Sequence, residues 1–389
     1  MKSIHILFLV LISFLFCSCG KRSFDLKAIE KERILNKVNN FIDIRPVTVA
    51  DSFCIRSAGT RNDFYSEGDY WWPNPEDPNV PYIRRDGISN PDNFKAHRRA
   101  IIRLNHIAGC LASAYILSDD NMYLKQIVPH LEAWFVNPET KMNPNLLYAQ
   151  AIQGKTTGRG IGIIDTVHLV EVALAVEILE KASILNGNQL NIIKQWFDDY
   201  KNWLIEHPFG KEERDNGNNH SVCWAVQIAA FSRLVNDEAN LNYCKTFYKK
   251  NLLPNQMASN GSFPKELNRT KPFGYSLFNL DAMSNLCQLL STKNDNLFEY
   301  KTEDGRSLEL GLQFLYPFIN NKSDWPYKED VMCFDNWPVR QSALLFGGKC
   351  YKNKDYLELW EDLEAEFEHE EIERNMPVKY PLLWFSRNY

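Results

Sequence analysis

Residues 167–185 read VHLVEVALAVEILEKASIL and give the clearest local indication of secondary structure in the chain. Their apolar residues recur at intervals of three and four, which is the period of an α-helix with an apolar face. Asp165 and Thr166 stand directly before the stretch, where their side chains can cap the first turn. The sequence therefore predicts a capped and strongly apolar helix here.

The same spacing returns along the chain from Asn93 onward. Strand-like alternation is nearly absent, and no Ser/Gly/Pro-rich linker divides the chain. We therefore predict an all-α fold, a single domain of helical hairpins arranged in a ring. Besides the first stretch, the predicted helices are 100–117, 122–135, 190–205, 221–234 and 308–318.

Segments rich in Gly, Pro, Asn and aromatic residues separate the predicted helices. Irregular segments of such length are uncommon in compact domains unless they carry function. We expect the functional site to be built from these segments, which are 51–93, 137–162, 207–219, 255–274 and 320–338.

The first residues have the pattern of an export signal. Lys2 supplies a short basic start, and residues 4–16 form an apolar run that is too short to span a membrane comfortably. The string FCSC that follows resembles a lipobox, in which the final cysteine, here Cys19, is lipidated. Plain cleavage without a lipid is the alternative.

We accordingly predict a signal over residues 1–19 and one mature domain over residues 20–389. The mature protein is expected in the periplasm or cell envelope, where a lipid at Cys19 would be its sole attachment to a membrane.

The composition argues against some partners and favours others. A formal net charge of −5 and the lack of a long basic tract argue against nucleic-acid binding. Aromatic residues make up 13% of the chain, more than a core needs, and exposed rings commonly hold sugar rings. An acidic polymer would need a local basic groove, and the candidates are Arg84, Arg85, Arg98, Arg99, Lys155, Arg159, Lys265, Arg269 and Lys271.

The sequence predicts neither a metal nor a cofactor. The seven cysteines that follow the signal are widely spaced without a CxxC pair, so neither a zinc site nor a compact disulfide framework is indicated. His168 and Glu171 stand one helical turn apart, but their helix is strongly apolar and no further ligand pair is apparent.

The sharpest motif is DNGNNHSVCW at residues 215–224. Asn218 or Asn219 can cap the helix that follows, so one interpretation is an N-cap with His220 in the first turn. The other interpretation is a binding site for a carboxylate. A helix N-terminus offers free N–H donors and positive potential, and Asn219 and His220 would add side-chain contacts to the carboxylate. His220 is also well placed for proton transfer.

Downstream, Arg269 and Tyr275 bracket a turn that leads into a helix predicted from about Tyr275 to Leu290. Taken alone, the two residues fit an ion pair and a core tyrosine. The joint pattern is Asn-Asn-His-Ser followed by Trp224, and later Glu-Leu-x-Arg followed by a tyrosine at a helix start. It resembles the alginate lyase family, which has an α/α-toroid fold.

That resemblance implies β-elimination at a 4-linked uronic acid. The C5 proton becomes acidic once the neighbouring carboxylate is neutralised, a role implied for Asn219, Arg269 and His220. Tyr275, with its pKa lowered by nearby cations, would take the C5 proton and donate one to the departing O4, leaving a 4,5-unsaturated ring. In an anti geometry His220 would be the base. Mannuronate-rich alginate is the first substrate expected, followed by glucuronan.

Further substrate contacts are expected beside these residues. The string SEGDYWWPNP at residues 66–75 resembles an early Trp-Pro loop of the family. One of its tryptophans is expected to stack on a sugar ring. The alternative is that the two rings only hold the loop on the helical body. The Gly-rich segment 150–162 suits an anionic ligand, or a structural turn. The substrate-binding candidates are Trp71, Trp72, Gln150, Gln153, Arg159 and Asn218.

Two other functions fit part of the sequence. An inverting glycoside hydrolase needs two carboxylates around the scissile bond, and the candidates Glu266, Asp281 and Asp165 show no pairing in sequence. A helical glycan-binding lipoprotein without catalysis fits the export signal and the aromatic content, but such a protein needs no Tyr, His and Arg set.

Overall fold

The computed structural model describes residues 24–77, 79–366, 369–376 and 378–386. The predicted signal and the lipidation site at Cys19 lie outside the described residues, so both stay predictions.

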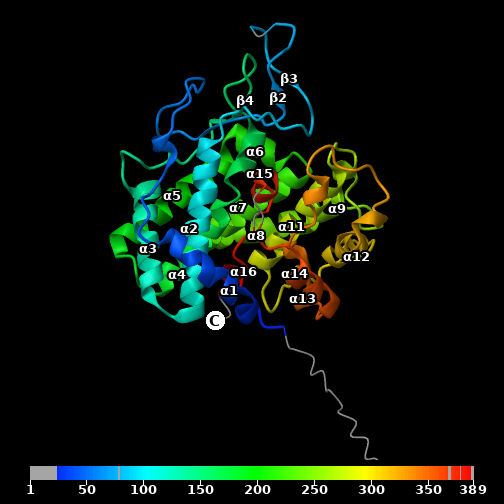
Figure 1. The fold of residues 1–389 in the computed structure, drawn as a ribbon. Coiled ribbons are helices and arrows are strands. Elements are labelled where there is room, and N and C mark those ends of the chain that lie inside the picture. Colours follow the sequence, from blue (N-terminus) through cyan, green and yellow to red (C-terminus); the bar gives the residue numbers. More distant parts are fainter. Residues whose placement is uncertain (1–23, 78, 367–368, 377, 387–389) are drawn as a thin grey trace, which may run out of the picture.

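Five helices form the inner part of the molecule, and each packs against the next in chain order (Figure 1). They are mostly buried, as their apolar sequences require. In order they are α2 (Ala96–Ser118), α4 (Leu169–Lys181), α7 (Asn219–Val235), α11 (Pro272–Leu290) and α13 (Ser342–Cys350).

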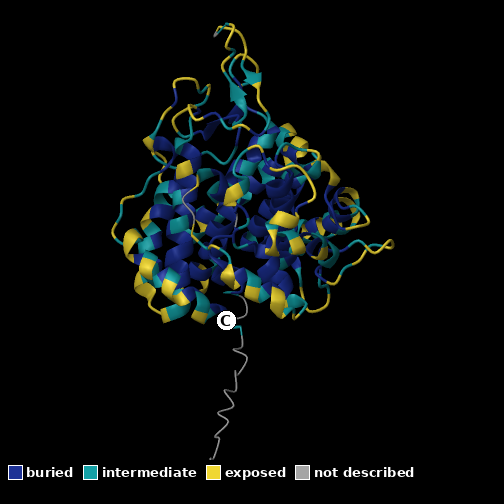
Figure 2. Ribbon diagram, turned by 45° about the vertical axis from the view of Figure 1, so that its right-hand side comes forward, coloured by how far each residue is buried: buried dark blue, intermediate teal, exposed yellow. Residues whose placement is uncertain are grey.

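A second set of helices covers these inner helices and exposes its polar residues (Figure 2). The helical class and the hairpin arrangement predicted from the spacing of apolar residues are therefore confirmed. The covering helices are α1 (Leu26–Val38) and α3 (Asn121–Leu131) on α2, α5 (Gly187–Glu206) and α8 (Glu238–Phe247) on α7, α12 (Leu308–Asn320) on α11, and α14 (Lys354–Asp362) on α13.

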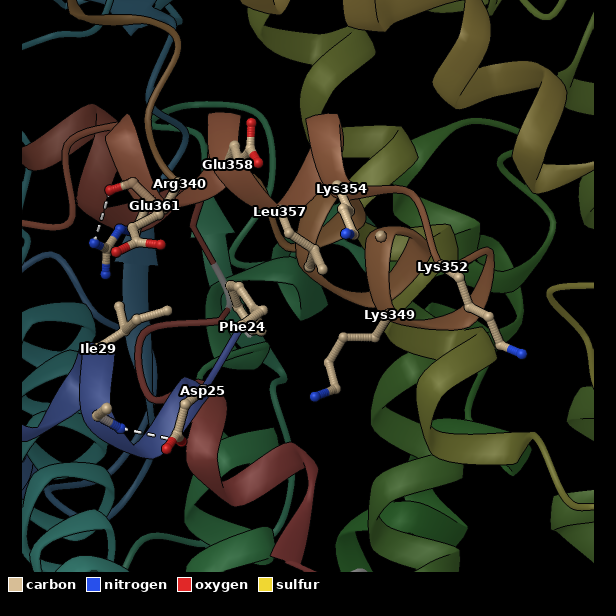
Figure 3. Close-up of a pocket in the computed structure, with 12 residues that line it drawn as sticks. Phe24, Asp25, Ile29, Arg340, Lys349, Lys352, Lys354, Leu357, Glu358 and Glu361 are labelled. Atoms are coloured by element: carbon tan, nitrogen blue, oxygen red, sulfur yellow. Dashed lines mark hydrogen bonds between the residues drawn. The ribbon is translucent and has the colours of Figure 1, made fainter. Parts of the chain in front are cut away.

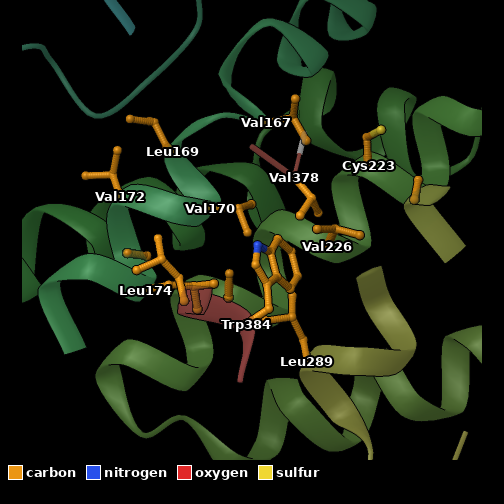
Figure 4. Close-up of a cluster of buried hydrophobic side chains, with 14 of the residues drawn as sticks. Val167, Leu169, Val170, Val172, Leu174, Cys223, Val226, Leu289, Val378 and Trp384 are labelled. Atoms are coloured by element: carbon orange, nitrogen blue, oxygen red, sulfur yellow. The ribbon is translucent and has the colours of Figure 1, made fainter. Parts of the chain in front are cut away.

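The core lies between the inner helices. Figure 4 shows Val170 of α4, Val226 of α7 and Leu289 of α11 around the ring of Trp384, which comes from the short C-terminal α16 (Pro381–Trp384). Glu171 accepts hydrogen bonds from the backbone N–H groups of Lys379 and Tyr380 and from the indole of Trp384. The C-terminal segment is thus fastened inside the helical body.

Four short strands occur in two of the predicted irregular segments. β1 (Tyr65–Glu67) pairs in parallel with β4 (Tyr148–Ala151), and β2 (Trp71–Trp72) pairs antiparallel with β3 (Ile83–Arg84). β2, β3 and β4 lie at one end of the helical body, opposite α1 (Figure 1). These strands are too short to show alternation in the sequence.

The structure corrects several boundaries and one cap. The predicted helix 167–185 is α4, which begins at Leu169 without a side-chain cap, so the predicted cap by Asp165 and Thr166 is wrong. The predicted loop 207–219 contains α6 (Pro208–Arg214), and α11 begins at Pro272 rather than at Tyr275. Both helices start with proline, which is well tolerated at the first helical position because its missing N–H is not needed there. The remaining short helices are α9 (Leu253–Gln256), α10 (Pro264–Leu267) and α15 (Glu370–Arg374).

Candidate active site

A pocket of about 310 Å³ opens where the loops meet the helical body. All four predicted catalytic residues line it: Asn219, His220, Arg269 and Tyr275. Four of the six predicted substrate-binding residues line it as well, namely Trp71, Gln150, Arg159 and Asn218.

The inner helices α7 and α11 both direct their N-terminal ends at this pocket, since Asn219 and His220 open α7 and Tyr275 stands in the first turn of α11. Helix N-termini carry positive potential and free N–H groups. The arrangement therefore favours a bound anion beyond what the charged side chains supply.

At the start of α7, Asn218 is the N-cap and its side-chain oxygen accepts the backbone N–H of His220 at 3.1 Å. The N-cap interpretation of the motif is therefore correct. Asn219 is held by Glu266, which accepts the backbone N–H at 2.8 Å and the side-chain amide at 2.9 Å. With Glu266 buried beneath it, the Asn219 amide is fixed at the pocket wall.

His220 is held by Glu213 of α6. Both oxygens of this fully buried carboxylate lie within hydrogen-bond distance of His220 Nδ1, at 2.9 and 3.0 Å. No sequence pattern points to Glu213, because it lies in the segment 207–219 that was predicted to be irregular.

Arg269 and Tyr275 are in direct contact. The guanidinium lies 4.6 Å from the centre of the Tyr275 ring, within the range of a cation–π interaction, and also donates to Asp86 at 3.2 Å. The Tyr275 hydroxyl shares a hydrogen bond with the hydroxyl of Tyr70.

The expected lowering of the pKa of Tyr275 is wrong for this state of the protein. Burial and the neighbouring Tyr70 hydroxyl raise the pKa of Tyr275 well above its ordinary value, although Arg269 acts in the opposite direction. The side chain is only 9% exposed, and removing a tyrosine proton in so dry a place is costly. Tyr275 is therefore a protonated phenol here.

Gln150 and Arg159 form one unit at the pocket wall. Arg159 donates to the backbone and side-chain oxygens of Gln150, at 2.9 and 3.1 Å. The Lys155 ammonium lies 4.6 Å from the centre of the Trp71 ring, and the Arg159 guanidinium lies 6.0 Å from it. Cations gather around this aromatic ring at the pocket edge.

Trp72 and Gln153 are not among the residues that line the pocket. The Trp72 indole donates to the backbone of Ile88 at 3.0 Å, and Gln153 donates to the Tyr65 hydroxyl at 3.4 Å. Trp71 therefore lines the pocket, whereas Trp72 holds its loop in place.

The three carboxylates considered for a hydrolase are dispersed. Asp165 lines the pocket, whereas Glu266 holds Asn219 from behind and Asp281 accepts the backbone N–H of Ala343. A second pocket carboxylate, Asp69, is paired with Arg98 and Arg374. These arginines hold the pKa of Asp69 at about 2, despite its burial.

Several residues of the pocket were missed by the sequence analysis. Tyr70 precedes the tryptophan pair and was passed over in favour of the rings that follow. Arg374 and Asn375 directly follow the acidic run at residues 361–373, and Arg374 forms ion pairs with Asp69 at 2.6 Å and with Glu371 at 2.8 Å. Local patterns gave no sign that this stretch reaches the pocket.

A larger hollow of about 820 Å³ lies between α1, α13 and α14 (Figure 3). Phe24, Lys349 and Leu357 are among its lining residues, and none of the predicted site residues is. Size alone therefore does not mark the functional pocket.

Comparisons with known proteins identify the family and the fold. The family model described as alginate lyase matches residues 50–325. The crystal structure of an alginate lyase from Bacteroides ovatus is 28% identical, with a TM-score of 0.80 over 92% of this chain and 93% of that one.

Two more distant structures share the fold. Alginate lyase A1-III from Sphingomonas species A1 is 13% identical, with a TM-score of 0.53 over 83% of this chain and 88% of that one. A variant of alginate lyase A1-III in complex with a tetrasaccharide is also 13% identical, with a TM-score of 0.59 over 90% of this chain and 93% of that one. No curated protein matches the chain significantly. Because the family model covers most of its length, this chain belongs to the alginate lyase family and is a polysaccharide lyase with the α/α-toroid fold.

Proposed function

We propose that this lyase cleaves a 4-linked polyuronate by β-elimination, with mannuronate-rich alginate as the first candidate and glucuronan as the second. The observation that carries the proposal is the convergence of Asn219, His220, Arg269 and Tyr275 on one pocket. Together they supply what the elimination needs, which is neutralisation of a carboxylate and transfer of a proton.

In the proposed reaction, the uronate carboxylate lies against Asn219, Arg269 and His220. Their hydrogen bonds and charge stabilise the carbanion-like state that forms when the C5–H bond breaks. The electron pair then forms the C4–C5 double bond, and the C4–O4 bond breaks. Tyr275 is the principal acid and base, and it returns the proton to O4.

The raised pKa of Tyr275 makes the order of events important. A protonated Tyr275 can donate a proton at once but cannot accept one. We propose that the substrate displaces Tyr70 from the shared hydrogen bond, so that Arg269 stabilises the phenolate and Tyr275 loses its proton to solvent only in the complex. His220 acts as the base on the opposite face for substrates of anti geometry.

A hydrolytic mechanism has less support. An inverting hydrolase needs a general acid that stays protonated near neutral pH. Asp69 is held ionised by two arginines, and Glu266 and Asp281 do not line the pocket. Asp165 lines the pocket but accepts hydrogen bonds from Ser66, Arg98 and Gln150, which favour its ionised form.

The test compares polymannuronate, polyguluronate, glucuronan, hyaluronan and a neutral glucan as substrates of the purified mature protein. Ultraviolet absorbance of the unsaturated product is followed beside a reducing-end assay. We expect both signals on one uronate polymer and neither on the glucan. New reducing ends without absorbance would instead demonstrate hydrolysis.

Tyr275→Phe keeps the buried ring and removes the hydroxyl, so we expect kcat to fall by about 1000-fold or more. Tyr200→Phe is the matched control, because Tyr200 is also buried and its hydroxyl bonds to Thr166 in the core. It should keep its activity even if it loses some stability.

We further propose that the protein is exported and anchored through a lipid on Cys19. Expression of the full chain with Cys19→Ala should move the protein from the membrane fraction to the soluble fraction. An unchanged distribution would contradict the anchor without affecting the proposed reaction.

A further inference from the structure

Glu213 is a buried acidic residue that the proposed chemistry leaves without a role. It stands in the last turn of α6, is fully buried, and does not line the pocket. Within the described part of the chain, the hydrogen bonds of its carboxylate go to one side-chain atom, His220 Nδ1. Burial raises the pKa of Glu213, and His220 counteracts that rise.

Burying a carboxylate without other hydrogen-bond partners costs free energy, so the buried position of Glu213 needs an explanation. The Glu213 carboxylate is not needed to stabilise the turn between α6 and α7. Ser221 already ties the turn, because its hydroxyl donates to the Glu213 backbone oxygen and accepts the backbone N–H of Gly217. The carboxylate is therefore dispensable for the path of the backbone.

The carboxylate does decide which nitrogen of His220 carries a proton. An ionised carboxylate can only accept hydrogen bonds, so the atom facing it must be Nδ1–H. Nε2 lies on the other edge of the ring, and that edge remains for the pocket that His220 lines. Such a carboxylate behind a functional histidine sets both its tautomer and its orientation.

We propose that Glu213 is a positioning residue that holds His220 as the Nδ1–H tautomer and presents Nε2 to the substrate. This inference deepens the role of His220 and rests on the proposed lyase function. Glu266 provides a parallel, because it orients Asn219, the preceding residue, from behind.

The consequence for catalysis follows from the proton balance. For a substrate of anti geometry, the lone pair of Nε2 in neutral His220 accepts the C5 proton, and the C–H electron pair forms the C4–C5 double bond. The C4–O4 bond breaks, and the Tyr275 hydroxyl protonates the departing O4. The resulting imidazolium is then compensated by Glu213, which keeps its negative charge throughout. In the opposite tautomer, Nε2 would carry a proton and could not act as a base. For a syn substrate, where Tyr275 is the base, the same contact between Nδ1–H and Glu213 leaves Nε2–H of a doubly protonated His220 to donate to the uronate carboxylate.

The first experiment needs no substitution. Nitrogen-15 labelling of the histidines in the mature protein, followed by long-range proton–nitrogen NMR, reports which ring nitrogen is protonated in each. His220→Gln assigns the signal by its loss. We expect Nδ1 of His220 to carry a proton. A neutral Nε2–H pattern would overturn the proposal.

The second experiment replaces the charge. In Glu213→Gln the amide can accept from Nδ1–H or donate to a bare Nδ1, so both tautomers become populated. We expect kcat on the responsive polymer to fall by about 10- to 100-fold with a much smaller change in KM. Glu213→Asp keeps the charge and should retain more kcat and the Nδ1–H pattern.

The control is Glu30→Gln, because Glu30 is as buried as Glu213 but pairs with Arg33 and Arg340 away from the pocket. It should lose stability without losing kcat or changing the His220 signal. If Glu213→Gln keeps kcat within about twofold, the positioning role is wrong. If the wild type cleaves no polymer, the proposed function fails, while the NMR pattern still decides the tautomer.

Discussion

Arg269 places a positive charge of the pocket in direct contact with Tyr275, the candidate acid. Its guanidinium lies against the Tyr275 ring and donates to Asp86. The planar guanidinium fits both contacts at once, since it stacks on a ring and presents several N–H donors at fixed angles. A compact ammonium fits only one of them.

Arg269→Lys should therefore lower kcat/KM by about 100-fold although the positive charge remains. The measurement is steady-state kinetics on the polymer that the wild type cleaves. Arg85→Lys is the matched control, because Arg85 stacks on Trp72 and does not line the pocket. Equal losses in both variants would show that the geometry of Arg269 is not what matters.

Asp281 gives a prediction about pH. It is buried in α11, where burial raises its pKa to about 7, although the backbone of Ala343 and Ser342 favours the ionised form. Between about pH 4, where the unfolded chain loses this proton, and about pH 7, the folded state keeps it. The contribution of Asp281 to stability is thus present at low pH and is lost as pH rises to about 7.

Asp281→Asn resembles the protonated side chain and should remove that loss. Urea unfolding of both proteins should show the variant gaining stability relative to the wild type as pH rises from about 4 to 7. A difference that stays constant with pH would mean that Asp281 does not titrate in this range.

Among the elements, the start of α11 matters most because it carries Tyr275. Asp330 comes from a distant loop and accepts the backbone N–H groups of Phe273 and Gly274, each at 2.8 Å. A Cβ on Gly274 would lie 2.8 Å from the Trp337 indole and 2.9 Å from Asp330, so only glycine fits there. The first turn is thus held by contacts from the 330–337 segment.

Asp330→Ala should cost about 1–2 kcal/mol of stability, as for a lost helix cap, and should also reduce kcat because the first turn of α11 is released. Thermal unfolding and kinetics are measured together. Asn353→Ala removes a cap from α14, far from Tyr275, and should affect stability alone. If both variants keep full kcat, Tyr275 does not depend on this capping.

At the scale of the whole molecule, the C-terminal segment joins the core to the pocket. Trp384 is buried among α4, α7 and α11 (Figure 4), while Arg374 and Asn375 reach the pocket wall. These residues lie beyond the region that the family model matches. The pocket is therefore completed by chain outside that region.

Trp384→Ala should destabilise the protein by about 3–5 kcal/mol, because a large core side chain is lost and the Glu171 carboxylate loses a donor. Chemical denaturation measures the loss. We also expect KM to rise at temperatures where the variant is still folded, since Arg374 is less firmly held. A variant with unchanged stability would contradict the conclusion that the Trp384 ring stabilises the core.

The sequence determined the features that depend on neighbours in the chain. Apolar spacing predicted the long helices, and Asn218 with Asn219 and His220 predicted a capped helix start, because periodicity and capping act within a turn or two. The four catalytic candidates were found by their motif, and the structure places all of them at one pocket.

Only the tertiary structure decided the partners of those residues. Tyr70 meets Tyr275 across 205 positions of sequence, and Glu213 reaches His220 from a helix that composition did not reveal. Arg374 forms its ion pair with Asp69 because burial of Trp384 in the core holds the C-terminal segment against the helical body. Burial and the pKa of Tyr275 follow from such distant contacts, and the orientation of His220 follows from a contact between residues of two helices only seven positions apart. Neither kind of contact leaves a periodic trace in the chain.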